Sequence, residues 1–73
     1  MCLVNIKKGQ TVAIVRIEDE DVRTQFIRFG ISEGSEIKCL EIIPFGPLML
    51  KHNRQEIAIG REVANTIFVS GRL

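Results

Sequence analysis

The stretch F-I-R-F-G-I-S-E-G-S-E-I at residues 26–37 decides the fold, because it joins a short amphipathic helix to a strand through two glycines. Phe26 and Phe29 are expected on the inward side of the last helical turn. Gly30 follows the last apolar residue of that turn, where a left-handed helix cap costs glycine no steric penalty. Ile31 is then expected to fold back onto the helix. The helix should therefore lie across one end of a small sheet.

Length and composition limit the class of protein. The chain has 73 residues, which is room for one domain, and we expect residues 1–73 to form it. Apolar residues make up 45% of the chain without any Trp or Tyr, so the core must consist of Ile, Val, Leu and the four Phe. A net charge of +1 does not support a nucleic-acid binder that works through phosphate attraction.

The two cysteines are too few for a disulfide framework. No apolar run approaches the roughly 20 residues of a membrane-spanning helix, and the sequence begins without the pattern of a signal peptide. We therefore expect a cytoplasmic protein with reduced thiols that does not insert into the membrane.

Alternating apolar residues predict five short strands, at residues 11–18, 36–43, 48–52, 55–59 and 66–70. In the first of them, Val12 and Ile14 share one face and Ile17 lies on the other. Because both faces are largely apolar, this strand suits a tightly curved barrel better than an open sheet. In the second strand the alternation slips between Cys39 and Leu40, which predicts a bulge or a sharp bend.

A helix is predicted over residues 20–29. Asp19 can cap its N-terminus, and Val22 and Phe26 begin an apolar stripe that Ile27 widens. The remaining side chains of this segment are mostly polar and should face water.

The ends of the chain complete the fold. Leu3 and Ile6 are expected to cover one end of the core, a helical turn at residues 61–65 precedes the last strand, and residues 71–73 should form a frayed tail. The order of elements predicts a mainly β fold. We expect a small five-stranded SH3-like barrel with one short helix after the first strand and a helical turn before the last. An OB-fold also has five strands, but its strands are longer and its helix comes later in the chain.

Few residues could carry chemistry. His52, the only histidine, is expected to be exposed, and Cys39 is expected to be a small buried hydrophobe. A metal site of Cys2, Cys39 and His52 is conceivable, but it lacks the close cysteine spacing of zinc sites. The sequence contains neither a phosphate-binding glycine loop nor a nucleophile elbow. We therefore predict a protein that is not an enzyme and has neither a cofactor nor a metal site.

Phe45 stands apart from the other phenylalanines, because it lies in the turn P-F-G-P at residues 44–47. Neither proline can donate to a sheet ladder, so this turn ends the second strand. An aromatic side chain on a short, stiff loop is a good contact residue. Two roles are therefore possible for Phe45: its ring covers the core, or it contacts a partner.

Taken together, these motifs resemble the ferrous iron transport protein A (FeoA) family, whose domain also forms the terminal SH3-like domain of iron-dependent repressors. The resemblance covers nearly the whole chain through motifs in one order: V-A-I-V-R-I at residues 12–17, F-I-R-F-G-I at 26–31 with Gly34, P-F-G-P-L at 44–48, I-A-I at 57–59 with Ala64, and I-F-V at 67–69. Two departures are a central loop one residue short and Gly60 where the family often has Arg, with Arg61 next to it.

The resemblance implies a small cytosolic barrel that is not itself an enzyme. It further implies an accessory role in iron uptake, in which the protein binds and modulates FeoB, a membrane ferrous-iron transporter with a cytosolic GTP-binding domain. On this hypothesis the contact residues are Arg28, Glu33, Phe45, Gly46, Pro47, Leu48 and Arg61. The alternative is a free-standing relative of the repressor domain. Direct metal carriage has the least support, and exposed strand edges would allow self-association.

Overall fold

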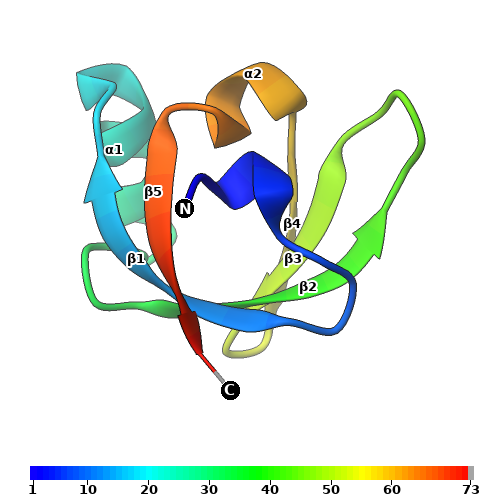
Figure 1. Ribbon diagram of the computed structural model, residues 1–73. Coiled ribbons are helices and arrows are strands. Elements are labelled where there is room, and N and C mark those ends of the chain that lie inside the picture. Colours follow the sequence, from blue (N-terminus) through cyan, green and yellow to red (C-terminus); the bar gives the residue numbers. More distant parts are fainter. Residues whose placement is uncertain (73) are drawn as a thin grey trace.

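The computed structural model describes residues 1–72 and contains one five-stranded antiparallel sheet in the order β4-β3-β2-β1-β5 (Figure 1). The strands are β1 (Thr11–Ile17), β2 (Glu36–Ile42), β3 (Leu48–His52), β4 (Gln55–Ile59) and β5 (Ile67–Arg72). A short 3-10 helix, η1 (Leu3–Asn5), precedes β1; α1 (Glu20–Arg28) follows β1, and α2 (Arg61–Ala64) precedes β5. The sheet curls around a core, which confirms the predicted mainly β barrel with its two helical segments. None of the helices within residues 1–72 is long and apolar enough to cross a bilayer.

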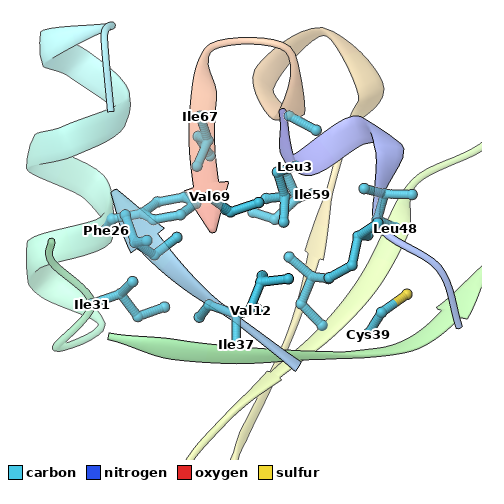
Figure 2. Close-up of a cluster of buried hydrophobic side chains, with 14 of the residues drawn as sticks. Leu3, Val12, Phe26, Ile31, Ile37, Cys39, Leu48, Ile59, Ile67 and Val69 are labelled. Carbon is cyan, nitrogen blue, oxygen red and sulfur yellow. The ribbon is translucent and has the colours of Figure 1, made fainter. Parts of the chain in front are cut away.

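Every strand and every helical segment contributes at least one buried apolar side chain to the core (Figure 2). Leu3 and Ile6 close one end of it, as predicted. Cys39 is fully buried among the aliphatic side chains, so the prediction that it acts as a small hydrophobe is confirmed. The remaining members of the core are Val12, Ile14, Ile17, Phe26, Ile31, Ile37, Leu48, Leu50, Ile59, Ala64, Ile67 and Val69.

The predicted faces of β1 were wrong in its second half. Ile17 was expected opposite Val12 and Ile14, yet all three side chains are buried in the core. The pairing of β1 with β5 shifts register between Ile14 and Arg16, so a bulge reverses the alternation at that point. Val15 and Arg16 both become exposed as a result. The bulge predicted in β2 is confirmed, since its pairing with β3 shifts between residues 39 and 41.

The corner after α1 has the geometry that the sequence predicted. Gly30 has a φ of 77°, its N–H donates to the carbonyl of Ile27, and the N–H of Ile31 donates to the carbonyl of Phe26, each bond being 2.9 Å long. This double bond pattern is a Schellman cap, whose hydrophobic partner is the residue after the left-handed glycine. Ile31 is that partner and is fully buried. At the other end of α1, the Asp19 carboxylate accepts from two backbone N–H groups, which confirms the N-cap.

The inward face of α1 is narrower than predicted. Phe26 is its one buried residue, and Val22 packs against the core from the preceding turn. Ile27 and Phe29 were expected to face inward, but they are 58% and 47% exposed. The helix lies across the end of the barrel and ends at Arg28, so only a single line of side chains reaches the core.

The predicted frayed tail was also wrong where the structure describes it. Gly71 and Arg72 continue β5 and pair with Val12 and Thr11 of β1. Leu73 lies outside the described residues.

Candidate protein-interaction surface

Phe45 is the most exposed large apolar side chain among the described residues, at 103% of its reference exposure. It lies in the loop between β2 and β3 and has a φ of 58°, in the left-handed region. A side chain with a Cβ costs roughly 1–2 kcal/mol in that region. The core-cover alternative is therefore wrong: the loop holds an aromatic ring in water on a strained backbone.

Backbone hydrogen bonds hold this loop in a single tight turn. The N–H of Gly46 donates to the carbonyl of Ile43 over 2.8 Å, and the N–H of Ile43 donates to the carbonyl of Pro47 over 3.2 Å. A Cβ added at Gly46 would lie 2.8 Å from Cγ2 of Ile43, so this position has no room for a side chain without movement. The loop thus presents Phe45 from a fixed base.

Arg61 joins the loop from the opposite side. It begins α2, and its Nη2 donates to the carbonyl of Ile43 over 3.1 Å. Between the two segments lies a shallow groove of about 430 Å³, lined by residues 45–47 and 60–63. The structure therefore brings Arg61 together with Phe45, Gly46 and Pro47, as the sequence hypothesis requires.

The groove also includes Glu62 and Val63, which the sequence reasoning did not select. They are 17 and 18 positions beyond Phe45 in the chain, and no motif connects the two segments. The helical turn predicted after Gly60 was the available signal, since a turn next to the end of β4 must lie near the start of the neighbouring β3.

Leu48 does not belong to this surface. It is fully buried, opens β3, and pairs with Ile59 of β4. Its alternation with Leu50 places it in the core, so its selection as a contact residue is corrected.

Arg28 and Glu33 lie elsewhere on the molecule. Figure 1 shows α1 and the loop between β2 and β3 on opposite sides of the barrel. Glu33 lines a separate groove of about 340 Å³ together with Arg23 and Ile27. Arg28 is exposed at the end of α1. The seven residues selected from the sequence therefore do not form one surface.

His52 was expected to be exposed, and this prediction was wrong. The ring is 9% exposed; Nδ1 lies 3.1 Å from the carbonyl oxygen of Glu36 and Nε2 lies 3.3 Å from the amide nitrogen of Asn53. The carbonyl can only accept, so Nδ1 carries the proton and Nε2 accepts from Asn53. His52 is the last residue of the strand predicted over residues 48–52, and the alternation of Leu48 and Leu50 continues to it and turns its ring inward.

The conceivable metal site has no counterpart in the part of the chain that the structure describes. Across residues 1–72, no group of three or more His, Cys, Asp or Glu side chains could hold a metal ion. Burial raises the pKa of the Cys39 thiol, and the nearby Glu41 carboxylate raises it further. Cys39 is therefore a protonated core thiol at neutral pH.

Comparisons with known proteins agree in family and fold. The family model of the FeoA domain matches residues 1–71. An iron uptake regulatory protein (FeoA) of known structure is similar with a TM-score of 0.86 and 25% identity, over 99% of this chain and 96% of that one. The FeoA protein from Chlorobium tepidum has a TM-score of 0.90 at 24% identity, over 100% and 71% of the two chains.

A manganese-dependent transcriptional repressor shares the fold at a TM-score of 0.86 and 24% identity, over 99% of this chain but only 41% of the repressor. The likeness thus concerns one part of a longer protein, in line with the SH3-like domain that the sequence suggested. Among curated proteins, no significant sequence match was found.

Proposed function

Because the chain belongs to the FeoA domain family, we propose that it is an accessory protein of ferrous iron uptake that binds and modulates a FeoB-like membrane transporter on its cytosolic side. The observation that carries the proposal is the full exposure of the Phe45 ring. A fully exposed aromatic ring on a strained backbone gives the isolated domain no packing in return for the strain. The ring gains that packing when a partner covers it.

The surface around Phe45 has the composition of an interaction site. The ring provides a large apolar contact area with few rotatable bonds. Arg61 and Glu62 supply charges of opposite sign at the rim of the adjoining groove. Central aromatic anchors with a polar surround are typical of the residues that dominate binding energy. We place the transporter contact on residues 43–47 and 60–63.

Contact, rather than catalysis, is the function that these side chains support. The two ring nitrogens of His52 already have partners, Glu36 and Asn53, within the domain. Cys39 is buried and its pKa is raised, so its thiol is a poor nucleophile. Modulation of the transporter would then follow from binding one of its conformations better than another.

An amide-shift titration tests this proposal. The isotopically labelled domain is titrated with the cytosolic GTP-binding domain of the transporter from the same organism. We expect the shifts to concentrate on residues 43–47 and 60–63. Shifts confined to the corner of α1 around Arg28 and Glu33 would contradict the assignment of the surface. The absence of shifts with the GTP-binding domain and with the full transporter in detergent would contradict the function.

The likeness to the repressor favours one second candidate, a free-standing regulatory module. Such a module would act on a DNA-binding protein rather than on DNA itself, because a net charge of +1 gives little attraction to phosphate. Two results would favour this candidate: capture of a metal-dependent repressor from the same organism, and no binding to the transporter.

A further inference from the structure

Strand β4 forms one edge of the sheet and offers unpaired backbone groups. It pairs with β3 from His52 opposite Gln55 to Leu48 opposite Ile59, across a two-residue connection. In such a hairpin, hydrogen-bonded and non-hydrogen-bonded pairs alternate, starting with a bonded pair next to the turn. Gln55, Ile57 and Ile59 therefore direct their N–H and C=O groups toward β3. The corresponding groups of the two residues between them, Glu56 and Ala58, point away from the sheet.

We propose that a second copy of this chain pairs with that edge, antiparallel and about a two-fold axis through Ile57. Glu56 of each copy then lies opposite Ala58 of the other, and each such pair exchanges two N–H···O bonds. Four backbone bonds form, and the two sheets become continuous. The proposal does not require the transporter contact, but the two surfaces share Glu62, which also lines the groove beside Phe45.

The side chains of β4 suit this arrangement. Ile57 packs against the core but is only half-buried, and the axis places it against Ile57 of the second copy. Ala58 is exposed and small, so it leaves room for the Glu56 side chain opposite it. A move of the two-fold axis by one residue toward the turn, from Ile57 to Glu56, would place Glu56 opposite Glu56, which repulsion between the carboxylates disfavours.

Charges at the two ends of β4 make the edge complementary to itself. Arg54 lies just before β4 and Glu62 lies just after it, in α2. Both are exposed, and neither makes an ion pair within residues 1–72. Antiparallel pairing brings Arg54 of each copy toward Glu62 of the other, so the attraction occurs twice. This self-complementarity identifies a second copy, rather than an unrelated strand, as the occupant.

The size of the edge sets the strength of the contact. Five residues span about 17 Å, which buries less than the roughly 800 Å² per partner of a stable complex. We therefore expect self-association with a Kd of about 0.1–1 mM.

The test measures amide shifts and sedimentation of the whole chain from about 0.02 to 2 mM, a range that spans this Kd. We expect concentration-dependent shifts on residues 54–60. Ala58→Pro removes an N–H that points away from β3, so it should leave the β3–β4 ladder intact and abolish the shifts. Ala58→Ser keeps the N–H and a small side chain and serves as the matched control, with shifts retained.

A charge exchange tests the same interface without touching the backbone. Arg54→Glu and Glu62→Arg should each weaken self-association by about 5- to 20-fold. The double variant, which restores opposite charges, should return to within about 2-fold of the starting affinity. Unchanged sedimentation and shifts over the full range, or self-association that Ala58→Pro and both single reversals leave unaltered, would overturn the proposal.

Discussion

The corner after α1 and the loop between β2 and β3 both contain a residue in the left-handed backbone conformation, but the two residues serve different purposes. Each contains a residue in the left-handed region, Gly30 at a φ of 77° and Phe45 at 58°. At the corner that residue is a glycine, and the next side chain, Ile31, is fully buried. In the loop that residue is a phenylalanine, and its side chain is in water. The corner builds the domain, whereas the loop presents a side chain to something outside it.

The comparison assigns the corner after α1 to the stability of the fold and the loop between β2 and β3 to contact with a partner. A residue that stabilises the fold should be costly to remove and have no effect on a partner beyond unfolding. A residue that serves contact should be removable without loss of stability. The predictions below compare the two regions on that basis, from the largest expected effect on stability to the smallest.

The largest effect is expected for Phe26→Ala at the corner. Removing a buried phenylalanine costs about 3–5 kcal/mol in free energy of unfolding, against a total of about 4–11 kcal/mol for a chain of 73 residues. The variant should be largely unfolded or unfold at low denaturant. Phe45→Ala should change the free energy of unfolding by less than about 0.5 kcal/mol. Equal losses in urea unfolding would remove the distinction between the two regions.

A smaller effect is expected when the left-handed residues themselves are exchanged. At Gly30 an added Cβ meets no atom within 4 Å, so Gly30→Ala loses only the backbone preference. We expect a loss of about 1 kcal/mol. Phe45→Gly relieves backbone strain but adds entropy to the unfolded chain, so its net change should stay below about 0.5 kcal/mol. Thermal or urea unfolding of both variants checks this, and a stabilised Gly30→Ala would contradict the role of the cap.

The smallest effect is expected from the pH dependence of the core thiol. Burial raises the pKa of Cys39 in the folded chain. Above about pH 9 the unfolded chain therefore releases this proton while the folded chain keeps it, and the free energy of unfolding falls as the pH rises. Cys39→Ala should show a shallower fall between about pH 8.5 and 10.5 in urea unfolding. The same slope in both proteins would mean that Cys39 does not contribute.

The barrel could be predicted because its signals are local. Gly30 and the alternation in five short segments specify a helix end and the strands without reference to distant residues. The bulge in β1 could not be predicted in this way. Both alternating sets of side chains in V-A-I-V-R-I include apolar residues, and which set faces the core depends on the pairing with β5. The burial of His52 was missed for a different reason, because its polar neighbours favoured an exposed side chain although its alternation with Leu48 and Leu50 in the predicted strand points inward.

Of the candidate surface, only the part in the loop between β2 and β3 could be predicted from the sequence. Phe45 stands between prolines in a recognisable motif, whereas the bond from Arg61 to the carbonyl of Ile43 links segments 18 positions apart. The sequence also gave no warning that Arg28 and Glu33 would lie on the other side of the barrel. That separation depends on the path of the whole sheet.

The most direct test of the account compares two exposed aromatic residues in one binding measurement. Affinity for the FeoB-like transporter is measured calorimetrically for the unaltered chain, for Phe45→Ala, and for Phe29→Ala as the matched control at the corner of α1. We expect Phe45→Ala to weaken binding by about 10- to 100-fold and Phe29→Ala to change it by less than about 2-fold. The reverse order, with Phe29→Ala weakening binding and Phe45→Ala leaving it unchanged, would contradict the central claim.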